Sequence, residues 1–158
     1  MNPVDYKLRW HGPATAPAAF DWRQTAALPL VGITAWEGLG DKARVQPGDK
    51  MLGWAGGVGH VAIQLAKARG AHVAAAVSSP AKADIVRALG TDAVVRYREE
   101  TSADCVGRLT DGHGFDLVLD AARGDSLNSA MAPARPNGQA VTIVASQQYD
   151  LTPAQSRA

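Results

Sequence analysis

Short apolar runs alternate along this chain with segments whose apolar residues recur every three or four positions. The runs have the length of strands and little of the polar alternation that a solvent-facing strand has. They occupy residues 51–52, 71–77, 93–95, 115–120 and 139–145. Apolar runs of this kind are typical of parallel strands that helices cover on both faces. We therefore expect five buried strands.

The segments around these strands predict helices. The expected helices cover residues 24–39, on both sides of Pro29, and residues 60–69, 83–89, 105–109 and 126–132. Clusters of turn-forming residues predict turns at residues 111–114 and 136–138. Strands and helices that alternate in this way predict an α/β fold with a doubly wound, Rossmann-like and mostly parallel sheet of about five strands.

A glycine-rich segment, Gly53-Trp-Ala-Gly-Gly-Val-Gly59, joins the first expected strand to the next helix. Glycines let the backbone turn sharply and approach a phosphate, and the first N–H groups of a helix point at the anion. Glycines also mark ordinary turns, so this segment alone is consistent with either interpretation. The helix at residues 60–69 and the strand at residues 71–77 complete a βαβ unit, which favours a dinucleotide site.

The residues after the second strand bear on the choice of dinucleotide. An NAD site usually places Asp or Glu about 20 residues beyond the glycines, where it binds the ribose hydroxyl. Here residues 77–82 contain no carboxylate, and the first one to follow is Asp84. The hydroxyl of Ser78 or Ser79 and the ammonium of Lys82 would bind a 2′-phosphate, so the sequence favours NADPH. Ser79, followed by proline, is also a good helix start, and both interpretations can hold together.

Composition and charge narrow the range of functions. The formal net charge of +1 gives no broad basic surface, so no nucleic-acid partner is expected. The single cysteine, Cys105, excludes an internal disulfide framework, and we expect a buried, inert thiol there. The four histidines lack metal-ligand spacing, so no metal site is predicted. We recognise no signal peptide and no long apolar run, and therefore expect a cytoplasmic protein with no membrane contact.

Several motifs resemble one protein family when they are taken in order. They lie at residues 26–39, 45–50, 53–59, 64–68, 78–82, 92–97, 116–120 and 135–138. With these motifs, the chain resembles the zinc-free quinone oxidoreductases of the medium-chain dehydrogenase/reductase superfamily over most of residues 25–150. Residues 2–9 resemble a short piece of the catalytic domain of that family.

The resemblance implies three parts of the chain and a truncation. Residues 1–24 would be a remnant of the GroES-like catalytic domain, residues 25–150 the dinucleotide-binding domain, and residues 151–158 a flexible tail. Members of the family are usually much longer, so we expect most of the catalytic domain and the sixth strand to be missing. The first strand is expected to be shortened. Trp54 stands where a small residue is common, so its indole would either obstruct the pyrophosphate or stack on a ligand.

The resemblance also assigns roles to individual residues. They are Gly56, Gly57 and Val58 at the pyrophosphate, Ser78 and Lys82 at the 2′-phosphate, Tyr97 on the adenosine side, Thr34 and Val144 facing the nicotinamide, and Asn2 in the substrate pocket. Two of them have a purely structural alternative. Tyr97 is also consistent with a partly buried aromatic residue at a strand end, and the Thr34 hydroxyl with a bond to its own helix backbone.

Two functions of different classes stay open. The resemblance implies an NADPH-dependent oxidoreductase that transfers hydride to a quinone, an enone or a similar small molecule. The alternative is a non-catalytic NADPH-binding module or sensor that lacks the catalytic domain. Without a sixth strand, the fifth would be an apolar sheet edge, and we expect a homo-oligomer to form through that edge.

Overall fold

The computed structural model describes residues 22–121 and 131–143. The described elements, in chain order, are α2 (Trp22–Trp36), the π-helix η2 (Glu37–Lys42), β1 (Lys50–Trp54), α3 (Gly57–Ala68), β2 (His72–Val77), α4 (Pro80–Ala88), β3 (Ala93–Arg96), α5 (Ser102–Thr110), β4 (Phe115–Asp120) and β5 (Ala134–Thr142). The predictions for Asn2, for Val144, for most of the helix at residues 126–132 and for the tail fall outside the described residues.

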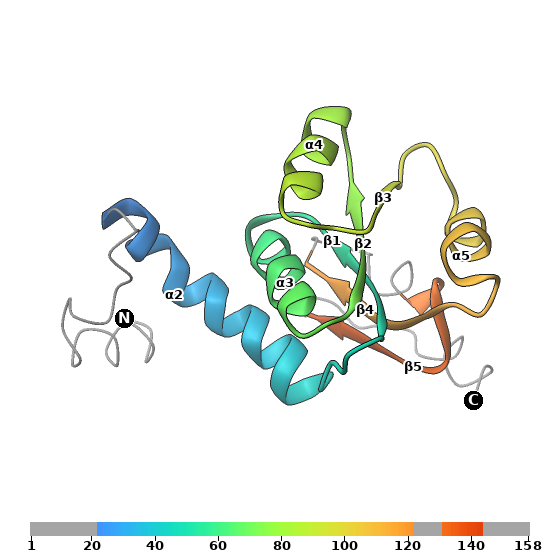
Figure 1. The fold of residues 1–158 in the computed structure, drawn as a ribbon, viewed down its shortest axis with the longest axis horizontal. Helices are drawn as coiled ribbons and strands as arrows, with labels where there is room; N and C mark the ends of the chain where they lie inside the picture. The colour runs from blue at the N-terminus through green and yellow to red at the C-terminus, as the bar shows by residue number, and fades with distance from the viewer. Residues whose placement is uncertain (1–21, 122–130, 144–158) are drawn as a thin grey trace.

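The sheet confirms the predicted fold class. Its five strands run in the order β3-β2-β1-β4-β5, and each neighbouring pair is parallel. The chain moves outward from β1 to β3 and then crosses to the other side of β1 to form β4 and β5 (Figure 1). This is a doubly wound sheet, and the order in which strands are added reverses between β1 and β4.

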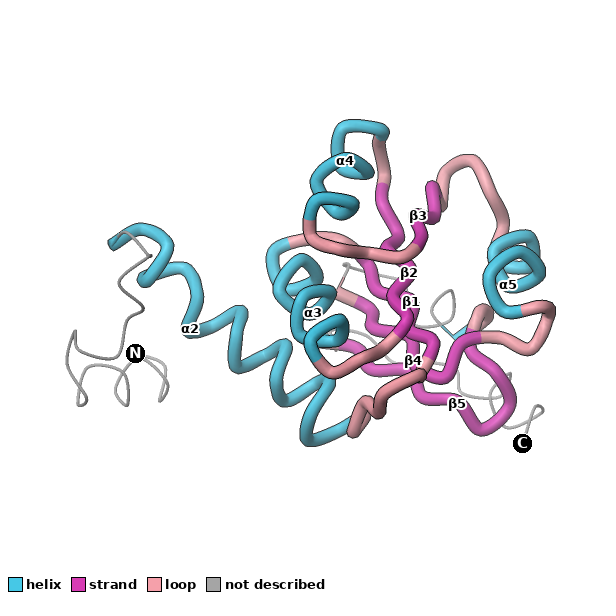
Figure 2. Tube along the Cα trace, viewed as in Figure 1, coloured by secondary structure: helices cyan, strands magenta, loops and turns pink. Residues whose placement is uncertain are grey.

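Two apolar layers cover the sheet. Helices α2, α3 and α4 contribute Ala35, Ile63 and Val86 to a cluster on one face, while α5 contributes Cys105 to a cluster on the opposite face. Figure 2 shows α3 and α5 on opposite sides of the sheet. Successive residues of a strand point to opposite faces, so each buried strand contributes side chains to both apolar layers. This explains its continuous apolar sequence.

Strand β1 differs from the prediction. We expected a shortened strand at residues 51–52 and a loop from Gly53 onward, but the strand continues through Gly53 and Trp54. Both residues pair with β2, opposite Ala75 and Ala76. The turn between β1 and α3 therefore consists of residues 55–56 and is shorter than the glycine-rich segment 53–59. Tertiary pairing outweighs the poor strand propensity of glycine here.

Strand β5 also begins earlier than predicted. The expected turn at residues 136–138 lies inside it, where the pairing with β4 shifts register between Phe115 and Leu117. Asn137 has a left-handed conformation at this irregularity, with φ of 59°. Within the described residues β5 stands at one end of the strand order. Self-association through this strand stays a prediction.

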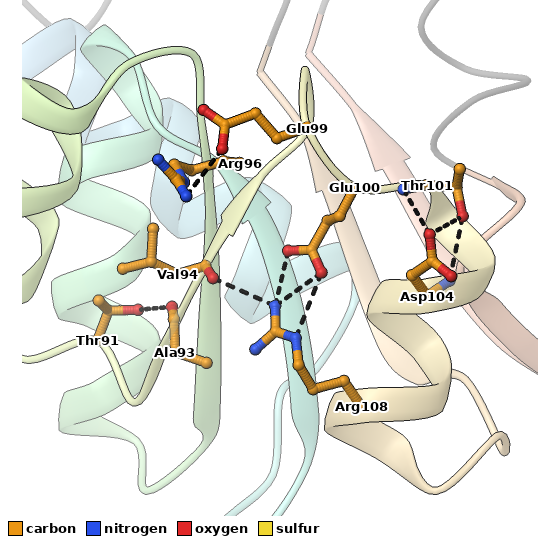
Figure 3. Close-up of polar contacts among 9 residues, drawn as sticks. All are labelled: Thr91, Ala93, Val94, Arg96, Glu99, Glu100, Thr101, Asp104 and Arg108. Carbon is orange, nitrogen blue, oxygen red and sulfur yellow. Dashed lines mark hydrogen bonds and ion pairs between the residues drawn. The ribbon is translucent and has the colours of Figure 1, made fainter.

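Helix boundaries follow local capping. The Ser79 hydroxyl accepts a hydrogen bond from the Lys82 N–H, and Pro80 opens α4, as its sequence predicted. Helix α5 begins earlier than expected, because Thr101 and Asp104 form a reciprocal capping box before its apolar residues (Figure 3). Pro29 lies inside the single helix α2, which continues directly into the π-helix η2.

Among the described residues, no helix is both long and apolar enough to cross a bilayer.

Candidate functional site

The candidate site lies where the strands of the sheet end. In open parallel sheets, ligands bind beyond the carboxyl ends of the strands, at the point where the strand order reverses. Here that point is between β1 and β4, which pair from Met51 to Gly53 against Leu117 to Leu119. The glycine turn follows β1 at this end of the sheet. The fold thus places the turn where a dinucleotide site is expected.

The glycine turn leaves room on one side and none on the other. A β-carbon at Gly56 or Gly57 would meet nothing within 4 Å. At Gly59, in contrast, a β-carbon would collide with the carbonyl group of Trp54, whose carbon would be only 2.9 Å away. Gly59 therefore allows α3 to pack against the end of β1, while Gly56 and Gly57 leave an open approach to the backbone.

Donors are available at this open side. The N-cap Gly56 is extended, and the first helical hydrogen bond runs from the His60 N–H to the Gly56 carbonyl at 3.0 Å. By helix geometry, the N–H groups of Gly57, Val58 and Gly59 precede that bond and lie at the positive end of the helix dipole. A row of donors at a helix start, with open space at Gly56 and Gly57, fits an anionic diphosphate.

The indole of Trp54 is half-buried and packs against the cluster on the α5 face, which includes Leu52 and Val118. Trp54 and Leu52 are two residues apart in β1 and so point to the same face of the sheet. The backbone of Trp54, rather than its indole, meets Gly59 of helix α3.

Ser78 and Lys82 lie together, as the sequence predicted. Ser78 follows the last residue of β2, and the ammonium of Lys82 donates a hydrogen bond to its hydroxyl at 3.1 Å. Lys82 is exposed, so its charge is accessible to a ligand. Ser79 caps α4, so the capping interpretation is confirmed, while the binding of a 2′-phosphate stays a prediction. A hydroxyl beside an ammonium suits a phosphate dianion.

Tyr97 and Thr34 occupy different surroundings. Tyr97 follows the last residue of β3 and is 43% exposed. It stands next to the end of β2, because Val77 pairs with Arg96. Thr34 lies in α2, and its hydroxyl donates to the Leu30 carbonyl at 2.8 Å, the backbone bond that was the alternative to a cofactor role. The roles of both residues toward the cofactor stay predictions.

Two polar residues near the site were not singled out as ligands by the sequence. Asp120 ends β4 with only 1% exposure, and the Thr142 hydroxyl donates to its carboxylate at 3.5 Å. His60 is exposed on α3, and its Nδ1 lies 3.1 Å from the Gly56 carbonyl oxygen. Asp120 could have been found because it ends a strongly apolar run. His60 could have been found because it follows Gly56 by four residues, one helical turn.

Within residues 22–121 and 131–143, no group of three or more His, Cys, Asp or Glu side chains is placed to hold a metal ion. The thiol of Cys105 lies on the buried face of α5. Burial, and to a smaller degree the nearby Glu100 carboxylate, raises its pKa to about 11. It is therefore a protonated core residue at neutral pH, as its sequence context predicted.

The family model that matches this chain is described as zinc-binding dehydrogenase and covers residues 57–155. A solved alcohol dehydrogenase superfamily protein from Novosphingobium aromaticivorans is 40% identical, with a TM-score of 0.84 over 89% of this chain and 42% of that chain. A quinone oxidoreductase from Pseudomonas syringae is 36% identical, with a TM-score of 0.72 over 80% of this chain and 40% of that one. The CurK enoyl reductase is 31% identical, with a TM-score of 0.78 over 90% of this chain and 43% of that chain.

Curated relatives include much longer proteins. A highly reducing polyketide synthase of Fusarium mangiferae is 38% identical over 82% of this chain. The spectinabilin polyketide synthase system protein NorB of Streptomyces orinoci is 40% identical over 81% of it. The chain spans 6% of the length of each of these two relatives.

Fold, glycine turn and relatives together define the nicotinamide-cofactor domain of a medium-chain dehydrogenase/reductase. The chain belongs to the zinc-binding dehydrogenase family. Its solved relatives include alcohol dehydrogenases, quinone oxidoreductases and enoyl reductases.

Proposed function

We propose that this chain is the cofactor domain of an NADPH-dependent oxidoreductase that reduces a quinone, an enone or a similar conjugated small molecule. The observation that carries the proposal is the open glycine turn at the switch point of the sheet, together with the Ser78–Lys82 pair after the neighbouring strand. Relatives named as quinone oxidoreductase and enoyl reductase support this class of acceptor.

The preference for NADPH rests on charge. A carboxylate at the end of β2 would favour a ribose hydroxyl and repel a 2′-phosphate. In this chain the corresponding position offers Ser78 and Lys82 instead. The first carboxylate to follow is Asp84 on α4, which accepts a hydrogen bond from Arg87 at 2.9 Å. A phosphate bound by Lys82 would therefore meet a cation and a hydroxyl.

Bound NADPH would supply the hydride, while the protein binds and orients the dinucleotide. The N–H groups of Gly57 and Val58 would hold the diphosphate, and Lys82 would fix the adenosine end. Tyr97 would lie beside the adenosine and Thr34 toward the nicotinamide. These roles come from the family resemblance. Tyr97 follows the end of β3, whereas Thr34 lies within α2.

The alternative is a domain that binds NADPH without turnover, as a module or sensor. The chain covers 40–43% of the solved relatives named above, so their reaction is a proposal for this chain. Both functions require the same nucleotide site. They differ only in whether a hydride acceptor can be reduced.

Calorimetric titration of the whole chain with NADPH and with NADH tests the site. We expect tighter binding of NADPH, and a Lys82→Ala variant should lose roughly ten- to a hundredfold in NADPH affinity with little change for NADH, because one charge-assisted contact is removed. Lys42→Ala, on η2, removes an exposed lysine elsewhere and serves as the control. Equal affinity for both cofactors in the unmodified chain would contradict the preference, and binding of neither would contradict the site.

Turnover separates the two functions. The chain is mixed with NADPH and a simple quinone or enone, and the loss of nicotinamide absorbance is followed. Turnover that falls in Lys82→Ala supports the oxidoreductase. Tight NADPH binding without any turnover supports the module.

A further inference from the structure

We infer that His60 is a positioning residue, whose imidazole sets the orientation of the glycine turn and thereby the affinity for the diphosphate of the cofactor. This inference rests on the proposed function, because it concerns the same site. It assigns a role to a side chain that belongs neither to the glycine motif nor to the 2′-phosphate contacts.

The hydrogen bond between His60 and Gly56 carries the inference. Nδ1 of His60 lies 3.1 Å from the Gly56 carbonyl oxygen. A carbonyl oxygen only accepts, so the ring nitrogen must be the donor in this contact. The backbone N–H of His60 donates to the same oxygen at 3.0 Å. One residue therefore engages this carbonyl twice, once through its backbone and once through its side chain.

The planarity of the peptide bond links this carbonyl to the binding surface. The Gly56 carbonyl and the Gly57 N–H belong to one trans peptide unit, so they point in opposite directions. When His60 draws the carbonyl toward α3, the N–H of Gly57 must point away from the helix. That N–H is the first donor of the proposed diphosphate site. His60 thus orients a donor that its own side chain does not touch.

Glycine makes such an anchor necessary. Gly56 and Gly57 have no side chains, and a β-carbon at either would meet no atom within 4 Å. Their backbone has more conformational freedom than that of any other residue, and it loses that freedom when a ligand binds. A second hydrogen bond to this peptide unit already restricts the backbone in the free protein, so less conformational freedom is lost when the ligand binds. Preorganisation of this kind raises affinity.

The chain contains a matched control for the test. One turn further along α3, the Gln64 amide donates to the His60 carbonyl at 3.0 Å. This is the same bond between a side chain and the carbonyl four residues earlier, but it lies outside the glycine turn. It also shows that a glutamine side chain on this helix reaches the carbonyl oxygen four residues before it. His60→Gln is therefore the conservative variant, and Gln64→Leu removes an equivalent bond elsewhere.

The experiment measures ligand affinity of the whole chain by calorimetry, with NADPH and with 2′-AMP, which has the 2′-phosphate but no diphosphate. His60→Leu should weaken NADPH binding roughly two- to tenfold, as expected for one neutral hydrogen bond. It should leave the affinity for 2′-AMP and the preference for NADPH over NADH unchanged. His60→Gln and Gln64→Leu should bind NADPH like the unmodified chain. Thermal unfolding of all variants checks that folding is unaffected.

Three outcomes would overturn the inference. Unchanged NADPH affinity in His60→Leu would remove any role for the ring. An equal loss for 2′-AMP would mean that the effect does not pass through the diphosphate site, and failure of His60→Gln to restore affinity would mean that the bond to Gly56 is not the cause. If the unmodified chain binds neither NADPH nor NADH, the proposed function fails instead, which is a separate result.

Discussion

Gly59 and the carbonyl group of Trp54 are in such close contact that no side chain fits between them. Replacing Gly59 by Ala would place its β-carbon against backbone atoms of β1, and α3 would have to move away from the sheet. Overpacking against backbone destabilises more than overpacking against a flexible side chain, so we expect a loss of about 3 kcal/mol or more in the free energy of unfolding. Urea unfolding followed by circular dichroism measures this loss.

Gly57→Ala is the matched comparison. A β-carbon at Gly57 meets nothing within 4 Å, and alanine favours a helix more than glycine does. This variant should be as stable as the unmodified chain, but it should bind NADPH more weakly, because the new methyl group stands where the diphosphate would approach. A stable Gly59→Ala protein, or a Gly57→Ala protein with full affinity, would contradict our account of the turn.

Much of the fold is readable from apolar runs that have clear ends. Strand β4 was predicted to the residue, since its run begins after a glycine and ends at Asp120. The start of α5 was missed, because its first turn is polar and held by the capping pair Thr101 and Asp104. The end of β1 was missed because Gly53 and Trp54 become strand residues only through pairing with β2.

The candidate site is predictable to a similar extent. Glycine spacing locates the turn. The Ser78 hydroxyl and the Lys82 ammonium at the end of β2 are hydrogen-bonded, while their role toward a 2′-phosphate stays a prediction. The bond from His60 to Gly56 depends on a side-chain rotamer, which the spacing of residues allows but does not determine. Sequence patterns determine which residues come near the site, while side-chain packing decides which atoms meet.

A second prediction concerns Asp92, which joins β2 and β3 to the end of α3. Its carboxylate accepts hydrogen bonds from the Val73 N–H at 2.6 Å and from the Lys67 ammonium at 2.7 Å. Partial burial alone would raise the pKa of Asp92, but the Lys67 and Val73 bonds outweigh it and hold the pKa below the ordinary value of 3.8. The ionised form is therefore favoured by folding.

The sign of the pH dependence follows from this lowered pKa. A carboxyl group whose pKa is lower in the folded state stabilises the protein above its unfolded pKa, and this stability is lost as the pH falls through the folded value. Because the side chain is 41% exposed, solvent screens the ion pair. Asp92→Asn should therefore lose only about 1 kcal/mol at pH 7, because its amide oxygen can still accept from the Val73 N–H but carries no charge for Lys67.

Urea unfolding at pH 7 and near pH 3 tests this prediction. The difference between Asp92→Asn and the unmodified chain should shrink at the lower pH, where the carboxyl group is protonated in the unfolded state. Asp84→Asn is the control, since that carboxylate is 78% exposed and pairs with Arg87 on its own helix. A difference that stays constant across the two pH values would contradict the role given to the charge.

The third prediction concerns the reactivity of Cys105. With its pKa raised to about 11 by burial and by Glu100, only about one thiol in a thousand is ionised at pH 8, and the side chain is 1% exposed. A disulfide reagent such as dithiobis-nitrobenzoate should therefore react with the unfolded chain within minutes and hardly at all with the native chain. Rapid labelling without denaturant would contradict the position of Cys105 on the buried face of α5.

The fourth prediction concerns the start of α5. The Thr101 hydroxyl accepts a hydrogen bond from the Asp104 N–H at 3.2 Å, and the Asp104 carboxylate accepts one from the Thr101 N–H at 3.1 Å. Thr101→Ala should lose about 1 kcal/mol of stability, because one N–H group of the first turn is left without its acceptor. Thr101→Ser keeps the hydroxyl and should retain most of that stability, as measured by urea unfolding. The capping box follows β3 and includes none of the residues proposed to bind the cofactor, so NADPH affinity should not change in either variant. A loss of affinity equal to the loss of stability would instead mean that α5 and the nucleotide site are coupled.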